Sequence, residues 1–281
     1  MTTETDTVTT DLARLASIAR QLRRDIIRST TAAGSGHPSS SLSMVELLTA
    51  LYFGGVMRFD SQNPLWPDRD RFILSKGHGC PGLYAALSEA GYFPREWLLK
   101  LREIDWPLEG HPKRNPELGI EAATGSLGQG LSIAIGHALA CRLDGRDARV
   151  YCMLGDGECQ EGQVWEAAMA ATHFHLDTLT AIVDHNKYQQ TGAVFTTMDY
   201  RPFAEKWRAF GWHTEEIDGH DQQEVLDAFQ RARAVSGHPQ VIIAHTIKGK
   251  GVSLMETDFT WHGRALSEEQ AVVALREIGD E

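Results

Sequence analysis

Two apolar segments of this chain each run directly into polar side chains suited to binding a metal ion. Gly155, Asp156 and Gly157 follow the apolar residues 150–154, and Asn186 lies just beyond residues 179–183. The carboxyl ends of parallel strands share one edge of a sheet, so Asp156 and Asn186 are expected to be neighbours. Mg²⁺ takes few protein oxygens together with water and phosphate. The pattern predicts a metal-bridged diphosphate site; the alternative is an Asx turn at Asn186 and a helix-capping Asp156.

Four histidines form a second group that suits proton transfer. His37, His78, His111 and His262 all lie in segments rich in glycine or proline. Imidazoles among small residues can face a polar ligand and exchange protons near neutral pH. None has a second histidine at metal-ligand spacing, so a zinc site is not expected. Taken singly, each histidine is better explained as an ordinary surface or core residue, and only the group of four favours a site.

The elements that must position these residues follow from hydrophobic periodicity and turn signals. Helices are expected at 11–32, from the capping-box pattern at 43–46, and at 81–90, 128–144, 160–172, 222–235 and after the capping pattern at 267–270. Strands are expected at 71–74, 150–154, 179–183, 213–217 and 241–245, with a long loop at 105–124 and a polar loop after 183. Strands that alternate with helices predict an α/β fold, a parallel sheet with helices on both faces. Residues 1–10 are expected to be frayed and 11–281 to form one domain.

Composition narrows the functional classes. The 281 residues carry 27 Lys and Arg against 38 Asp and Glu, and this net charge of −11 argues against nucleic-acid binding. No run approaches the ~20 apolar residues of a membrane span, and the first residues are not those of a signal peptide. The four cysteines show no CxxC spacing, so we expect reduced thiols in a cytoplasmic protein.

Seven motifs, in order, resemble the N-terminal, diphosphate-binding domain of transketolases. They lie at residues 35–38, 71–78, 108–112, 124–130, 155–162, 184–186 and 261–263, and the resemblance extends from about 12 to 270. It implies the thiamine diphosphate-binding fold, with thiamine diphosphate and a divalent metal as cofactors, Mg²⁺ or else Ca²⁺ or Mn²⁺.

The resemblance also implies roles for individual residues. Metal ligands would be Asp156, Asn186 and the carbonyl of Tyr188. Cofactor contacts would come from His78, Gly125, Ser126, Leu127, Gly155, Gly157, Glu158 and His262, with Ser126 standing where many members have proline. His37 and His111 would face the sugar, making four catalytic histidines with His78 and His262. Glu161 and Glu166 would lie at a subunit interface. Lys248 and Lys250 would either reach phosphate or be solvated.

The implied reaction is transfer of a two-carbon ketol unit from a ketose to an aldose, either of which can be a phosphate. A full transketolase has a further domain that binds the pyrimidine ring, and 281 residues cannot contain it. We therefore expect the first subunit of a split enzyme, an α2β2 heterotetramer with a pyrimidine-binding subunit, and Trp165 and Met169 could contribute to the partner-facing surface. Alternatives are another thiamine-dependent enzyme, a specialised enzyme for an unusual sugar or natural-product intermediate, and a non-catalytic subunit or remnant.

Overall fold

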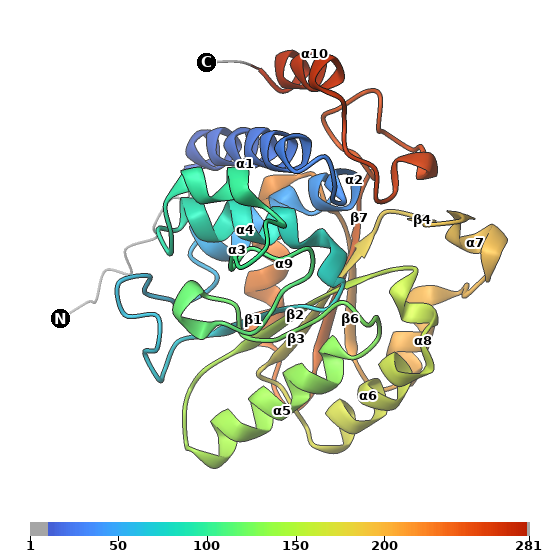
Figure 1. The fold of residues 1–281 in the computed structure, drawn as a ribbon. Coiled ribbons are helices and arrows are strands. Elements are labelled where there is room, and N and C mark those ends of the chain that lie inside the picture. Colours follow the sequence, from blue (N-terminus) through green and yellow to red (C-terminus); the bar gives the residue numbers. More distant parts are fainter. Residues whose placement is uncertain (1–10, 280–281) are drawn as a thin grey trace.

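A five-stranded parallel sheet forms the centre of the molecule in the computed structural model, which describes residues 11–279 (Figure 1). The strand order is β1 (Arg71–Leu74), β2 (Val150–Gly155), β3 (Leu179–His185), β7 (Gln240–His245) and β6 (His213–Asp218). Every neighbouring pair is parallel. The predicted α/β class and parallel sheet are confirmed.

Helices cover both faces of this sheet. One face carries α1 (Leu12–Ala32), α3 (Val45–Phe53), α4 (Cys80–Glu89) and α9 (Gln222–Ala234), and α10 (Glu268–Ile278) packs on the outer side of α1. The other face carries α5 (Gly130–Leu143), α6 (Gly162–His173) and α8 (Phe203–Ala209). Side chains of β2 alternate between the two cores, with Met153 in the first and Leu154 in the second. The central strands are therefore buried on both sides, which explains their continuous apolar sequences.

One helix start was predicted wrongly. The pattern at 43–46 is not a capping box, because α3 begins at Val45 after Met44 and has no side-chain cap. A short helix that the sequence did not predict, α2 (Pro38–Leu42), precedes it with proline in its first turn, where the missing N–H costs nothing. The Ser43 hydroxyl is buried and donates to Asp184 instead, at 2.7 Å. At the C-terminal helix the capping box of Ser267 and Gln270 is confirmed.

The polar loop after β3 contains structure that periodicity did not reveal. It holds the hairpin of β4 (Tyr188–Gln189) and β5 (Gly192–Ala193), then α7 (Val194–Thr197) and α8. Strand β3 itself runs two residues beyond the predicted end, because Asp184 and His185 continue its pairing with β7. Short 3-10 turns occur at Gly77–Gly79, Arg95–Lys100, Pro116–Leu118, Glu158–Gln160 and Phe259–Trp261.

Among residues 11–279, no helix combines the length and the apolar character that crossing a bilayer would require.

Candidate active site

The carboxyl ends of β2, β3 and β7 border a cavity of about 270 Å³. Gly155 pairs with Asp184 across these strands, so residues 156 and 186 come together as the sequence predicted. The cavity is lined by Ser40, Lys76, His78, Leu127, Gly155, Asp156, Gly157, Glu158, Gln160, Glu161, Asn186, Tyr188, Gln189, Gln190, Thr191, Lys248 and His262. Most of the predicted cofactor and metal residues thus border one space.

Asp156 is a buried carboxylate on the cavity wall. Its Oδ1 accepts the Gly157 N–H at 2.8 Å and its Oδ2 accepts the Lys187 N–H at 2.6 Å. Burial, and then the nearby charge of Asp184, raises the pKa of Asp156 to about 7. Within residues 11–279 no lysine or arginine forms an ion pair with it. A buried carboxyl without a cation is stabilised by a metal ion, so Asp156 fits a metal ligand.

Asp184 sits beside Asp156 and organises the residues around it. It pairs with the Lys76 ammonium and accepts hydrogen bonds from the hydroxyls of Ser43 and Thr246. Burial alone would raise the pKa of Asp184, but the charge of Lys76 together with the hydrogen bonds from Lys76, Thr246 and Ser43 outweighs burial and holds the pKa below its usual value. Asp184 also accepts the amide of Asn186 at 2.8 Å. The amide nitrogen is thereby committed, and the side-chain oxygen of Asn186 is left for other partners.

Asn186 combines the two alternatives that the sequence left open. Its Oδ1 accepts the Tyr188 N–H at 3.2 Å, which is the Asx turn considered above. The same oxygen has a second lone pair. The turn therefore fixes the direction of Asn186 and remains compatible with a metal ligand.

Lys248 lies inside the cavity wall and is only 1% exposed, so the solvated alternative is wrong for it. Its Nζ donates to the Tyr188 carbonyl at 3.2 Å and lies 2.9 Å from His262 Nδ1. Burial, followed by the charge of Lys76, lowers the pKa of Lys248 to about 8. Lys250 is half-buried and does not line the cavity.

Two buried residues of the wall, and one buried residue beside it, received no role from the sequence. Lys76, buried like Lys248, donates to the Ser40 carbonyl at 2.7 Å. The Ser40 hydroxyl is buried and has no hydrogen-bond partner among the described residues. Asp184 is the third. The signal available was that Lys76 and Asp184 are charged residues at the ends of apolar strands. Two buried ammonium groups and an unpartnered hydroxyl beside the Asp156 loop fit an anionic group such as a diphosphate.

The four loop histidines come together above this wall. The ring centroid of His37 lies 5.1 Å from that of His78, 5.2 Å from that of His262 and 6.3 Å from that of His111. Burial is the main cause that lowers the pKa of every one, to about 4 for His37 and about 3 for His262. The next cause is a neighbouring cation, Arg102 for His37 and Lys248 for His262. The imidazoles are therefore neutral at pH 7 and able to accept a proton.

The remaining predicted residues surround this centre. A Cβ on Gly125 would lie 2.9 Å from the His111 ring, so this glycine permits their close packing. Ser126 is exposed and accepts a hydrogen bond from Gln129. The carboxylate of Glu158 is turned into the protein, where it accepts the N–H groups of Gly128 and Gly155. A cofactor contact from Glu158 would therefore have to come from its backbone.

The residues predicted to face another subunit lie on or near α6. Glu161 and Glu166 are exposed, and their role at an interface remains a prediction. Met169 is 54% exposed, whereas Trp165 packs against Trp207 at 5.1 Å between ring centroids. Trp165 is thus mainly a packing residue.

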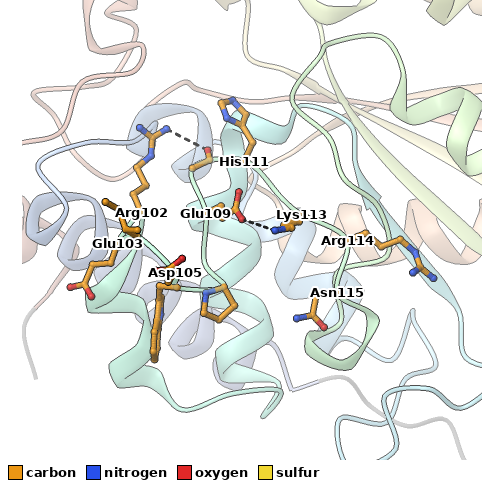
Figure 2. Close-up of a pocket in the computed structure, with 12 residues that line it drawn as sticks. Arg102, Glu103, Asp105, Glu109, His111, Lys113, Arg114 and Asn115 are labelled. Atoms are coloured by element: carbon orange, nitrogen blue, oxygen red, sulfur yellow. Dashed lines mark hydrogen bonds and ion pairs between the residues drawn. The ribbon is translucent and has the colours of Figure 1, made fainter.

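A second, more open cavity of about 970 Å³ is lined by residues 102–107, 109–111 and 113–115, which include His111 (Figure 2). Arg102 donates to the Ser35 hydroxyl at 2.7 Å and to the Gly110 carbonyl at 3.4 Å, and its charge lowers the pKa of His37 and His111. Lys113 pairs with Glu109 at 3.4 Å. The sequence predicted a long loop here, with His111 as its site residue.

Comparison with known proteins gives the same family as the sequence motifs. The family model for the thiamine diphosphate-binding domain of transketolase matches residues 12–280. The chain is 45% identical to a 6-deoxy-6-sulfo-D-fructose transketolase subunit of Clostridium sp. (strain MSTE9), covering 96% of this chain and 97% of that relative. It is 39% identical to an apulose-4-phosphate transketolase subunit of Actinobacillus succinogenes, covering 94% of this chain and 95% of that relative.

Longer relatives match over the same region. Human transketolase is 43% identical over 95% of this chain, which spans 42% of that protein. Among solved structures, transketolase from Leishmania mexicana superposes with a TM-score of 0.89 at 32% identity, covering 95% of this chain and 41% of that one.

Proposed function

We propose that the chain, which belongs to the transketolase family, is the diphosphate-binding subunit of a two-chain transketolase. The family membership rests on its match to the thiamine diphosphate-binding domain of transketolases. The enzyme transfers a two-carbon ketol unit from a ketose, or its phosphate, to an aldose or its phosphate. The observation that carries this proposal is the single cavity in which the metal donors, two buried lysines and two of the four histidines meet.

We assign the cofactor to this cavity with Mg²⁺ as its metal. Asp156, the side-chain oxygen of Asn186 and the Tyr188 carbonyl hold the metal, and the raised pKa of Asp156 supports this because a bound cation compensates its charge. Lys248 and the Ser40 hydroxyl bind the diphosphate. Thiamine diphosphate, when bound, supplies the nucleophilic carbon at which the sugar's carbon–carbon bond is broken and re-formed.

The chain's own contribution to the reaction is proton transfer and orientation. His37 and His111 face the sugar, and as neutral imidazoles they accept a hydroxyl proton and return it when the new bond forms. His78 and His262 act nearer the cofactor, where the ammonium of Lys248 lies 2.9 Å from His262 Nδ1. That contact directs the acceptor lone pair of His262 Nδ1 to Lys248 and leaves the Nε2–H to donate toward the cavity.

The proposed partner supplies the pyrimidine-binding domain, in an α2β2 assembly with Glu161 and Glu166 at the interface between copies. Two relatives named as transketolase subunits are matched over 97% and 95% of their lengths, whereas this chain spans 42% of the human enzyme. The four cysteines are buried free thiols, which supports a reducing, cytoplasmic location.

For the substrate, the names of the two subunit relatives favour a specialised sugar over a common pentose phosphate. One relative is named for a sulfonated fructose and the other for apulose 4-phosphate. We therefore include a ketose that carries a terminal sulfonate or phosphate among the first candidates. Arg102 lines the second cavity together with His111 and is a cation that either anion could approach.

The test is turnover by the purified chain with and without its co-purified partner. With thiamine diphosphate and Mg²⁺, the pair is expected to convert ketose and aldose mixtures that include sulfonated and branched sugars, and the chain alone is expected to show no turnover. Steady-state activity of the chain by itself would contradict the two-chain proposal. Absence of turnover by the pair on every ketose, together with no cofactor binding, would favour the non-catalytic alternative.

A further inference from the structure

A buried charged cluster lies behind the cofactor cavity, on the far side of the segment that carries Lys248. Arg23 on α1 pairs with Glu46 on α3 at 2.7 Å, and Glu46 also contacts His220 Nδ1 at 2.9 Å. Their side chains are only 9–12% exposed. None of the three lines the cavity, and none belongs to the seven motifs that resemble transketolases. We call Arg23, Glu46 and His220 the anchor cluster.

Both ends of the anchor cluster reach the same short segment after β7. The Ile247 N–H donates to His220 Nε2 at 2.8 Å, and Arg23 Nε donates to the Lys250 carbonyl at 3.1 Å. These two contacts lie on either side of Lys248. Residues 246–250 contain no regular secondary structure, so their position depends on such contacts rather than on a helix or a strand ladder.

The hydrogen bonds also fix the state of the His220 ring. The Glu46 carboxylate can only accept, so His220 Nδ1 must carry a proton. Ile247 donates to Nε2, so that nitrogen must present a lone pair. Both requirements are met by the ring with its proton on Nδ1. His220 therefore connects a buried carboxylate directly to the backbone one residue before Lys248.

From this geometry we propose that the anchor cluster is a positioning device, which holds Lys248 at the diphosphate end of the cavity. A buried ammonium loses its solvation. Its contribution to the binding of an anionic ligand therefore depends on the protein holding it within hydrogen-bond distance of that ligand. The cluster lies on α1, α3 and the loop before α9, and its hydrogen bonds to Ile247 and Lys250 tie the segment after β7 to these elements. This inference rests on the cofactor role proposed for Lys248.

The experiment compares three variants of the anchor cluster with one matched control. His220→Leu removes both hydrogen bonds, and His220→Gln keeps an acceptor for the Ile247 N–H. Glu46→Gln removes the charge that Arg23 and His220 share. His238→Leu is the control, since His238 is an exposed histidine just before the opposite end of β7.

The first readout is hydrogen exchange of the full-length chain, which requires neither partner nor activity. Peptides that cover residues 246–252 are expected to exchange at least about tenfold faster in His220→Leu than in the wild type, and faster than the wild type in Glu46→Gln as well. His220→Gln and His238→Leu are expected to change them less than about threefold. Unchanged exchange in this segment, or a uniform increase along the whole chain, would overturn the anchoring.

The second readout is the binding of thiamine diphosphate with Mg²⁺ to the two-chain enzyme. Near-ultraviolet circular dichroism monitors this binding. The half-saturating concentration is expected to rise about tenfold in His220→Leu and to recover in His220→Gln, as for other outer-shell partners of a bound group. The KM for the sugar at saturating cofactor should change little. Faster exchange with unchanged cofactor binding would refute the link to Lys248. Absence of turnover by the wild-type pair would reject the proposed function. The hydrogen-exchange result would still test whether the anchor cluster holds residues 246–252.

Discussion

At the scale of single residues, Asp156 and Asp184 show how neighbouring strand ends give two buried carboxyls opposite properties. Lys76 pairs with Asp184 and keeps its pKa low. Asp156 has no such partner among the described residues, and burial raises its pKa to about 7. Asp184 is therefore committed to the protein, and Asp156 is available to a metal ion.

This difference predicts the effect of Asp156→Asn. In the proposed two-chain enzyme, Mg²⁺ with thiamine diphosphate should raise the unfolding temperature of the wild type, because a ligand at about 100 times its Kd adds about 2.7 kcal/mol. The variant is expected to lose that increase. Asp147→Asn, at a side chain that is 94% exposed, serves as the control. Equal shifts in both variants, measured by differential scanning calorimetry, would argue against Asp156 as a ligand.

The position of His37 predicts a change in turnover rather than in cofactor binding. His37 lies among the other three histidines but does not line the cofactor cavity. His37→Ala should lower kcat about 100-fold, the size of a typical general acid–base contribution. Its half-saturating thiamine diphosphate concentration should stay near that of the wild type. An unchanged rate in the reconstituted enzyme would contradict this role.

The lowered histidine pKa values predict how stability depends on pH. The pKa of His37 is about 4 in the folded chain and near 6.5 when the chain is unfolded, so between these values the unfolded state binds more protons. The contribution of His37 to the free energy of unfolding is thus fully present above pH 6.5 and decreases as the pH falls toward 4. One such group contributes less than about 1.4 kcal/mol per pH unit.

His37→Asn should therefore make the acid loss shallower. Urea unfolding of the wild type and variant at pH 7 and pH 5 measures this, with the difference between their free energies of unfolding expected to change with pH. A difference that is the same at both values would mean that His37 does not titrate in this range.

At the scale of elements, the sequence predicted what burial and periodicity dictate. Strands β1, β2, β3 and β7 alternate side chains between two apolar cores, the edge strand β6 contributes only Ile217 to a core, and α1 and α9 carry apolar stripes, so these patterns could be recognised in the sequence. The capping box at Ser43 was predicted wrongly because the Ser43 hydroxyl donates a hydrogen bond to Asp184. Asp184 is distant in the sequence, so no local pattern reveals this contact. The cavity was predictable from the glycines and acids at strand ends. The pairing of Lys76 with Asp184 and the contacts of the anchor cluster were not predictable, because the partners are far apart in the sequence.

The segment after β7 predicts a difference between two glycines. Gly249 and Gly237 both have positive φ, at +81° and +75°. A Cβ on Gly249 would lie 2.6 Å from the Met255 backbone, whereas one on Gly237 meets nothing within 4 Å. Gly237→Ala should cost about 1–2 kcal/mol, the usual left-handed penalty. Gly249→Ala should cost clearly more, in chemical denaturation, and should also weaken cofactor binding. Equal costs would show that the segment moves freely to accept the methyl group.

At the scale of the whole molecule, apolar side chains are exposed at and near the rim of the cofactor cavity. Leu127 lines that cavity and is 37% exposed, and Phe195 on α7, which follows the Gln189–Thr191 wall, is 50% exposed. Leu143, 86% exposed at the C-terminal end of α5, does not line the cavity. Apolar groups beside a site that another chain completes suit a docking surface for that chain.

This arrangement predicts where a charge disrupts assembly. Leu127→Glu and Phe195→Glu should each weaken binding of the pyrimidine-binding partner at least about tenfold, because a carboxylate would be buried without a partner. Leu143→Glu adds the same charge away from the cavity and should leave the complex intact. Analytical ultracentrifugation of each variant mixed with the partner chain measures how much complex forms. Equal weakening by all three variants would indicate a general effect of charge, and no weakening by any of them would place the partner on another face.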